Sequence, residues 1–213
     1  MAATESEAKL IQYLNEAYSK EKELETALQA HISLATRATY KKRLQQHLQE
    51  TKRHGRDVER RIKQLGGNGT TELAATVQAT AAKAIALAQG PLHAVRGTGE
   101  AERQLKNAKT EYANEAEEIA TYTAIEALAE SVGDRDTAQL ARTIRRDEER
   151  MGSFLERLIP QLTRAVAQAE IPASQRRSTG RRRRSGTRSR SRSGSRSSRS
   201  AARGRRNTSA RSR

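Results

Sequence analysis

Four long segments of the chain repeat their apolar residues at spacings of three and four, the period of an amphipathic α-helix. The first covers residues 4–31, and its stripe consists of Leu10, Leu14, Ala17, Glu21, Leu24 and Leu28. The second covers residues 37–65, and its stripe consists of Tyr40, Leu44, His47, Thr51, His54, Val58, Ile62 and Leu65. The third covers residues 100–132, and its stripe consists of Leu105, Ala108, Tyr112, Glu115, Ile119, Tyr122 and Ala129, with Glu118 beside it. The fourth follows residue 134, and its stripe consists of Ala141, Ile144, Glu148, Met151, Leu155 and Leu158. No stretch alternates apolar and polar residues over the length of a strand, so the sequence predicts an all-α fold.

Residues with known preferences for helix ends mark where these segments begin and stop. Thr4 and Glu7 have the spacing of a capping box, in which each side chain bonds a free backbone amide of the other residue. Gly133 is placed to end the third helix, and Asp134 to cap the fourth. Pro160 predicts a bend or an end in the fourth helix, with a shorter helical piece after it.

The connection between the second and third helices, residues 66–99, is long. It opens with the glycine-rich run "GGNG" and contains an Ala-rich segment, about residues 71–89, that is typical of a short helix. A connection of this length can return along the bundle, as the long crossover of ferritin-like bundles does. We therefore expect one domain over residues 1–170, with a hairpin at 4–65, this crossover, and a second hairpin at 100–170.

Each of the four helices places a carboxylate on or beside its apolar stripe. These are Glu21, Glu50, Glu118 (with Glu115 nearby) and Glu148. His47 and His54 share a helix face with Glu50, at three residues before it and four after it. Acids that converge in a core repel one another and raise each other's pKa values, and a metal ion with oxygen and imidazole ligands relieves this. A metal site is one interpretation. The other is that the acids are solvated and that the histidines pack between helices.

Four stretches resemble a bacterial ferritin-like family typified by the stress-associated protein YciF, over residues 7–160. They are "YSKEKELETAL", "HLQETKRHGRDVE", "EAEEIATYTAIEALAESVGD" and "RRDEERM". The resemblance implies a four-helix ferritin-like bundle, a homodimer and a candidate di-metal centre of iron or manganese. The positions that match the family's ligands are Glu21, Glu50, His54, Glu118 and Glu148, with His47 and Glu115 as further candidates.

The sequence departs from the ferritin-like pattern, in which two helices each supply a Glu-x-x-His pair. Three residues after Glu50 stands Arg53, and three residues after Glu148 stands Met151. Ala116 stands where relatives tend to have a histidine. A complete site with two histidines therefore cannot be assigned from the sequence. We expect a weak, single-metal or vestigial site at most, or acids neutralised by Arg53 or Arg145, and at most weak ferroxidase or peroxidase activity.

The whole net charge of +16 lies in the last 40 residues, because residues 1–173 hold equal numbers of basic and acidic side chains. Residues 174–213 contain no acid, 12 serines and 16 arginines. The arginines are Arg176, Arg177, Arg181, Arg182, Arg183, Arg184, Arg188, Arg190, Arg192, Arg196, Arg199, Arg203, Arg205, Arg206, Arg211 and Arg213. A segment with so little to bury cannot offset the entropy of ordering, so the sequence predicts a disordered tail over residues 171–213.

Such a tail suits nucleic acid, because guanidinium groups donate paired hydrogen bonds to phosphates and stay charged. It has no aromatic residue to stack on bases, so binding would be independent of base sequence. Our first functional hypothesis is that a dimer coats or compacts nucleic acid through this tail as part of a stress response; DNA is the preferred partner, and RNA stays open. The alternative is a di-metal carboxylate protein with a redox or iron-handling role, in which the tail serves only localisation. A solubilising tail and attachment to a membrane surface are weaker interpretations.

Composition narrows the classes of protein and of metal site to which the chain could belong. The chain has no cysteine, which excludes disulfides and thiolate metal sites. The N-terminal stretch "MAATESEAKL" is acidic and polar, unlike a secretory signal, and no run of about 18 apolar residues predicts a membrane span. We therefore expect a cytoplasmic, nucleoid-associated protein that does not insert into membranes.

Overall fold

The computed structural model describes residues 4–67 and 99–176, and these form four long α-helices and one short 3₁₀ helix. The elements are α1 (Glu5–Leu34), α2 (Ala38–Gln64), α5 (Glu100–Ser131), α6 (Arg135–Glu170) and η1 (Ala173–Gln175). Within these two ranges there is no strand, so the all-α prediction is confirmed. The described residues extend to Arg176, a few residues into the segment expected to be tail, and the rest of that segment lies outside them.

The helix ends form as their residues predict. The Thr4 hydroxyl accepts a hydrogen bond from the Glu7 amide at 3.2 Å, and the Glu7 carboxylate accepts one from the Thr4 amide at 2.7 Å. Asp134 accepts a hydrogen bond from the amide of Thr137 at 3.0 Å and so caps α6. Gly133 has φ of +77° after the end of α5, a conformation that glycine adopts without strain.

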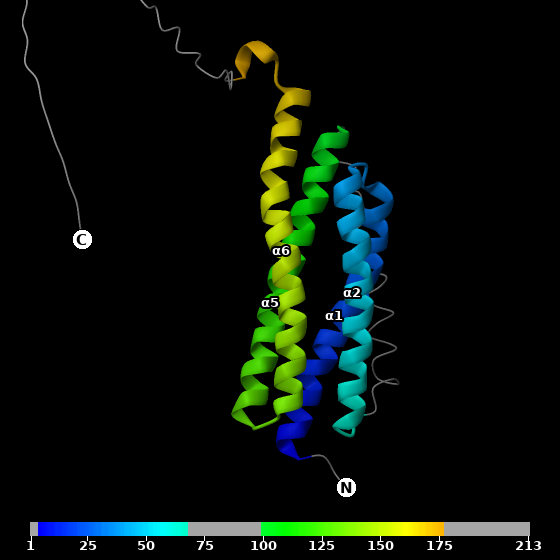
Figure 1. The fold of residues 1–213 in the computed structure, drawn as a ribbon, viewed down its shortest axis with the longest axis vertical. Coiled ribbons are helices and arrows are strands. Elements are labelled where there is room, and N and C mark those ends of the chain that lie inside the picture. The colour runs from blue at the N-terminus through cyan, green and yellow to red at the C-terminus, as the bar shows by residue number, and fades with distance from the viewer. Residues whose placement is uncertain (1–3, 68–98, 177–213) are drawn as a thin grey trace, which may run out of the picture. The chain divides into compact units, whose positions relative to one another are not determined.

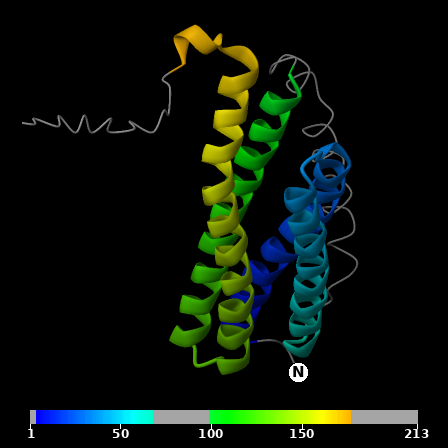
Figure 2. The same ribbon diagram turned by 45° about the horizontal axis from the view of Figure 1, so that its top comes forward.

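The helices form two antiparallel hairpins, α1 with α2 and α5 with α6, and these lie side by side (Figure 2). Thr36, in the turn between α1 and α2, donates a hydrogen bond at 2.6 Å to Glu100 at the start of α5. At the other end of the bundle, Arg61 near the end of α2 donates to Asp134 at 2.7 Å. The end of α2 and the start of α5 therefore lie at opposite ends of the bundle (Figure 1). The crossover itself, with its expected short helix, lies outside the described residues.

The expected stripes of α1, α2 and α6 are buried, except that Leu65, the residue just after α2, is only partly buried. The stripe of α5 differs from the prediction. Tyr112 is 41% exposed, whereas Glu111, one residue earlier, is fully buried. The face of α5 that meets the core is therefore more acidic than its sequence pattern suggests.

Pro160 does not end α6, which continues to Glu170 as one helix. Leu158 and Leu162, on either side of the proline, are both buried in the core. Their burial stabilises the helix by about 1.5–3 kcal/mol for each side chain, which offsets the roughly 3 kcal/mol that an interior proline costs. Tertiary packing thus outweighs the local signal for a helix end.

In the ranges 4–67 and 99–176, no helix combines the length and apolar character needed to cross a bilayer.

Candidate metal centre

All four helices contribute a buried polar side chain to the middle of the bundle. Six residues meet there with exposed fractions of 0–1%: Glu21 from α1, His47 and His54 from α2, Glu115 and Glu118 from α5, and Glu148 from α6. Each continues the apolar stripe of its helix, so the same periodicity that builds the core carries these groups into it.

These six residues form two groups whose nearest ligand atoms lie within 4.8 Å of one another, and Glu148 belongs to both. In the first group, His47 Nε2 lies 3.1 Å from Glu115 Oε1 and 3.6 Å from Glu148 Oε2, and Glu118 completes the set. In the second, His54 Nδ1 lies 2.9 Å from Glu148 Oε1 and 3.6 Å from Glu21 Oε1. A carboxylate shared between two ligand sets is the arrangement expected of a paired-metal site.

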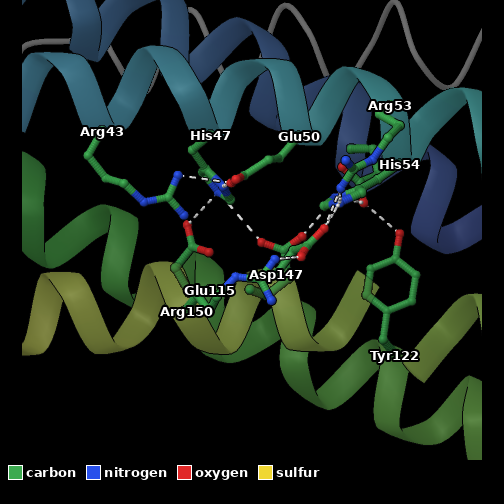
Figure 3. A network of polar contacts seen from close by, with 11 residues as sticks. Arg43, His47, Glu50, Arg53, His54, Glu115, Tyr122, Asp147 and Arg150 are labelled. Atoms are coloured by element: carbon green, nitrogen blue, oxygen red, sulfur yellow. Dashed lines mark hydrogen bonds and ion pairs between the residues drawn. The ribbon is translucent and has the colours of Figure 1, made fainter. Parts of the chain in front are cut away.

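Each histidine is held by a carboxylate on the side that faces away from its group (Figure 3). His47 Nδ1 donates to Glu50 at 3.2 Å, and His54 Nε2 donates to Asp147 at 3.0 Å. An ionised carboxylate only accepts, so each one favours the tautomer with the proton on the outer nitrogen; in a neutral ring of that form the inner nitrogen presents a lone pair to the group. Histidines that ligate metals have this type of outer partner, which fixes the ring and its tautomer.

Arginines in turn hold the outer carboxylates. Arg43 donates to Glu50 at 2.9 Å, while both Arg53 and Arg150 contact Asp147 (Figure 3). Partial burial disfavours the charge on Glu50, but hydrogen bonds from His47 and Arg43 lower its pKa to about 2. Glu50 therefore stays ionised over the whole physiological range.

Most of the inner carboxylates have raised pKa values instead, which favour their protonated form. Burial raises the pKa of Glu21 to about 8, partly opposed by His54, and that of Glu115 to about 8, partly opposed by His47. Burial and the neighbouring charge of Glu148 raise the pKa of Glu118 well above its ordinary value. Only the pKa of Glu148 is lowered despite its burial, by the nearby His54 and His47. Without a cation, this cluster cannot hold all its acids ionised.

Several inner oxygens have no hydrogen-bond donor among the described residues. They are both carboxylate oxygens of Glu118 and of Glu148, and one oxygen each of Glu21 and Glu115. A buried ionised group without a partner costs several kcal/mol, so these oxygens require a proton or a cation. Hard oxygen donors with two imidazoles suit a divalent transition metal, so the residues present fit such a group.

Arginine does not neutralise the inner acids, as one interpretation of the sequence supposed. Arg53 contacts Asp147 instead, and Arg145 contacts Glu126 and Glu149.

The structure brings together six of the seven sequence-predicted candidates and leaves Glu50 outside. Glu50 is displaced because its carboxylate is 25% exposed and is held by Arg43 and His47. Both histidines of α2, His47 and His54, lie in the cluster, one in each ligand group. They lie seven residues apart, which is two helical turns, and so occupy the same face.

Sequence reasoning missed two parts of the site. Asp147, adjacent to Glu148, is 4% exposed and orients His54. The Tyr122 hydroxyl donates to Glu21 at 2.5 Å (Figure 3). Tyr122 was assigned to the core as an apolar residue, although a buried hydroxyl needs a partner and so signals a nearby acceptor.

A second buried pair, His31 with Glu111, lies further along α1 and α5. His31 stands three residues after Leu28 and continues the α1 stripe, so its burial follows from the same spacing. Glu111 stands four residues before Glu115 and could have been found in the same way.

The predicted nucleic-acid ligands lie almost entirely outside the described residues. Of the sixteen arginines of the tail, the structure describes only Arg176, which is half-buried just after η1.

Fold and site together define a four-helix bundle protein with a buried carboxylate–histidine cluster that could bind a metal. The chain belongs to the family described as the domain of unknown function DUF892, whose model matches residues 5–168. This is the YciF-like family, so the resemblance found in the sequence is confirmed.

The solved structures that are similar to the chain include the following two. A protein from Xanthomonas campestris pv. campestris is 27% identical with a TM-score of 0.62, and the match covers 78% of this chain and 99% of the other. The stress protein YciF of E. coli is 20% identical with a TM-score of 0.62, and the match covers 76% and 98%. The second similarity shows the ferritin-like fold alone. The comparison with curated proteins finds no match.

Proposed function

We propose that the chain holds two transition-metal ions, iron or manganese, between its helices. One ion would be held by His47, Glu115, Glu118 and Glu148, and the other by Glu21, His54 and Glu148. The observation that carries the proposal is the pair of buried ligand sets that share Glu148, with several carboxylate oxygens lacking any donor. Such ions would supply one-electron redox chemistry or a store of metal.

The protein's own groups have separate tasks in this proposal. Glu50 and Asp147 hold the outer nitrogens of His47 and His54, so the inner nitrogens keep their direction. Tyr122 donates to one oxygen of Glu21. The surrounding core excludes water, because all six inner residues are at most 1% exposed. These features support tight and ordered binding; we propose weak ferroxidase or peroxidase activity at most.

Metal analysis after anaerobic loading with Fe²⁺ or Mn²⁺ tests the proposal. We expect about two equivalents for each chain, as in paired-metal bundles. Glu148→Ala, which removes the shared ligand, should lose most of this metal. Glu130→Ala is the matched control, because Glu130 is exposed and contacts Arg142 outside both groups. Failure of the unaltered chain to bind metal under any loading condition would overturn the proposal.

We propose a second function, sequence-independent binding of DNA through the C-terminal tail. It is supported by the separation of charge, since residues 174–213 hold 16 arginines and no acid while the rest of the chain is formally neutral. Phosphates are the natural partners of such a segment. In a homodimer, two tails would bridge separate duplexes and compact them.

A chain that ends at Ala173 tests this second function, because it keeps all four long helices. We expect it to lose DNA binding at low salt while its helicity and melting temperature stay unchanged. Light scattering of both forms measures the oligomeric state. Full DNA affinity in the shortened chain would show that the helices and not the tail bind DNA.

A further inference from the structure

A pocket of about 190 Å³ opens between α5 and α6 beside the buried cluster. Its principal lining residues are Tyr112, Glu115, Ile119, Glu149, Gly152 and Glu156. Tyr112 and Glu156 are exposed, whereas Glu115 and Gly152 are buried. The pocket thus extends from the surface to the interior of the bundle.

Glu115 connects this pocket to the candidate metal centre. Its Oε1 atom lies 3.1 Å from His47 Nε2 within the first ligand group, while its Oε2 atom is buried and has no hydrogen-bond partner. Glu115 is 1% exposed, and the other five inner residues are buried to the same degree. Glu115 is the inner residue that lines this pocket, so an ion in the pocket would lie beside a member of the first ligand group.

The outer part of the pocket is acidic. Glu149 and Glu156 contribute carboxylates, and of these Glu149 is paired with Arg145. Carboxylate oxygens bind hydrated divalent cations, and a cleft lined by one sign of charge raises the local concentration of the opposite ion. The chemistry of the rim therefore suits cation capture.

Gly152 forms part of the pocket wall in the middle of α6, where glycine is a poor helix former and costs about 1 kcal/mol relative to alanine. A Cβ atom added there would lie 3.8 Å from Glu115 Cβ and 3.9 Å from Ile119 Cδ1. These are ordinary contact distances, so alanine fits without displacing anything. A larger side chain would extend into the pocket and fill it.

We propose that this pocket, the α5–α6 pocket, is the entry port through which a divalent cation reaches the buried centre. The inference rests on the proposed metal-binding function and adds the route. Glu149 and Glu156 capture the ion, Glu115 Oε2 receives it, and Gly152 keeps the passage open.

The principal competing route runs along α5 from the end of the bundle. Gln104, Asn107 and Glu111 form a buried polar stripe there, and Gln104 also lines a second pocket beside the α1–α2 turn. This route is longer, and His31 is paired with Glu111 across it. Asn107→Leu would block it without touching the α5–α6 pocket.

Loading of the metal-free full chain with Co²⁺ tests the port, because bound cobalt absorbs visible light and can be followed by stopped-flow and by equilibrium titration. In Gly152→Leu we expect the loading rate to fall by about tenfold or more, the scale on which charged clefts alter association rates. The equilibrium affinity should stay within about threefold, since every ligand is kept. Gly152→Ala is the matched control and should load at nearly the rate of the unaltered chain.

A second variant, Glu149→Gln with Glu156→Gln, alters only the rim and is not expected to disturb folding. It should load more slowly at low salt and lose most of the salt dependence of the rate. Unchanged loading in Gly152→Leu and in this double variant would overturn the port, as would slow loading in Asn107→Leu alone. If Gly152→Leu fails to fold, the loading rate of the double variant alone decides whether the α5–α6 pocket is the entry port. Absence of cobalt binding by the unaltered chain would overturn the metal-binding function, and the port with it.

Discussion

His54 Nδ1 lies 2.9 Å from Glu148 Oε1 in the interior, although neither atom has a hydrogen-bond partner with suitable geometry. The other ring nitrogen of His54 donates to Asp147, the residue beside Glu148 in the sequence. In the neutral ring, two lone pairs therefore face each other at close range. This contact is favourable only if a proton or a cation lies between the two atoms, which makes it a sensitive reporter of the state of the site.

Replacement of Asp147 by asparagine should weaken metal binding without removing a ligand. The amide can present its NH₂ group to His54 Nε2 and so favour the tautomer that places the proton on the inner nitrogen. Loss of such an outer partner lowers metal affinity by about 10- to 100-fold. Calorimetric or competition titration with Mn²⁺ would measure the change, with Asp57→Asn as a control because Asp57 pairs with Arg60 on the surface. Equal affinities for Asp147→Asn and the unaltered chain would contradict the orienting role.

The metal-free protein should lose stability as the pH rises from about 5 to 8. In the folded chain the pKa values of Glu21 and Glu115 are raised to about 8, whereas the same groups in the unfolded chain ionise near 4.5. Between these values the unfolded state has released protons that the folded state retains, so rising pH favours unfolding. The raised pKa of His47 acts in the same direction. The lowered pKa values of Glu148 and Glu50 act at lower pH, where stability is lost as the pH falls.

Thermal melts of the metal-free chain at several pH values measure this effect. A decrease of about 1 kcal/mol or more in the free energy of unfolding corresponds to a fall in melting temperature of about 2–4 °C or more. Glu118→Gln should flatten the profile, because it removes one of the acids that interact in the core. Saturating metal should reverse the trend, since binding releases protons and strengthens with pH. A melting temperature that rises steadily from pH 5 to pH 8 without metal would contradict the raised pKa values.

Pro160→Ala should stabilise the protein. Pro160 lies in the interior of α6 with its side chain exposed to solvent, and it lacks the amide N–H that would complete the hydrogen bonds of the helix. Its neighbours Leu158 and Leu162 would keep their packing in the variant. We expect a gain of about 1–3 kcal/mol, seen as a higher denaturant midpoint with an unchanged slope. Arg157→Ala, at another exposed position of α6, should change stability by no more than about 0.5 kcal/mol. A destabilised Pro160→Ala would mean that the proline stabilises α6 where it stands.

DNA binding by the tail should depend steeply on salt. If about 8 to 12 of its 16 arginines neutralise phosphates, log K falls against log salt concentration with a slope of about −7 to −11. Fluorescence anisotropy with two unrelated duplexes at several salt concentrations measures both the slope and the preference between sequences. A slope shallower than about −3, or a preference of about tenfold for one duplex, would indicate recognition by the folded helices.

The sequence by itself determined the helices, because their periodicity is local. The stripe through Leu10, Leu14 and Leu24, the capping box at Thr4 and the turn at Gly133 all follow from spacings of three or four residues. The same periodicity carried Glu21 and Glu148 into the core. The charge of the tail was also evident from composition.

Only the tertiary structure decided which polar groups meet. Glu50 shares a helix face with His47, yet Arg43 draws its carboxylate outward and leaves the inner position to residues from the other hairpin. The burial of Glu111 in place of Tyr112 follows from the rotation of α5 against its neighbours, a rotation of less than half a turn that no local pattern specifies. The pattern of a helix gives the angle of each side chain about the helix axis. Which of these angles face the common centre is set by the packing of the four helices, because that packing depends on contacts between residues far apart in the chain.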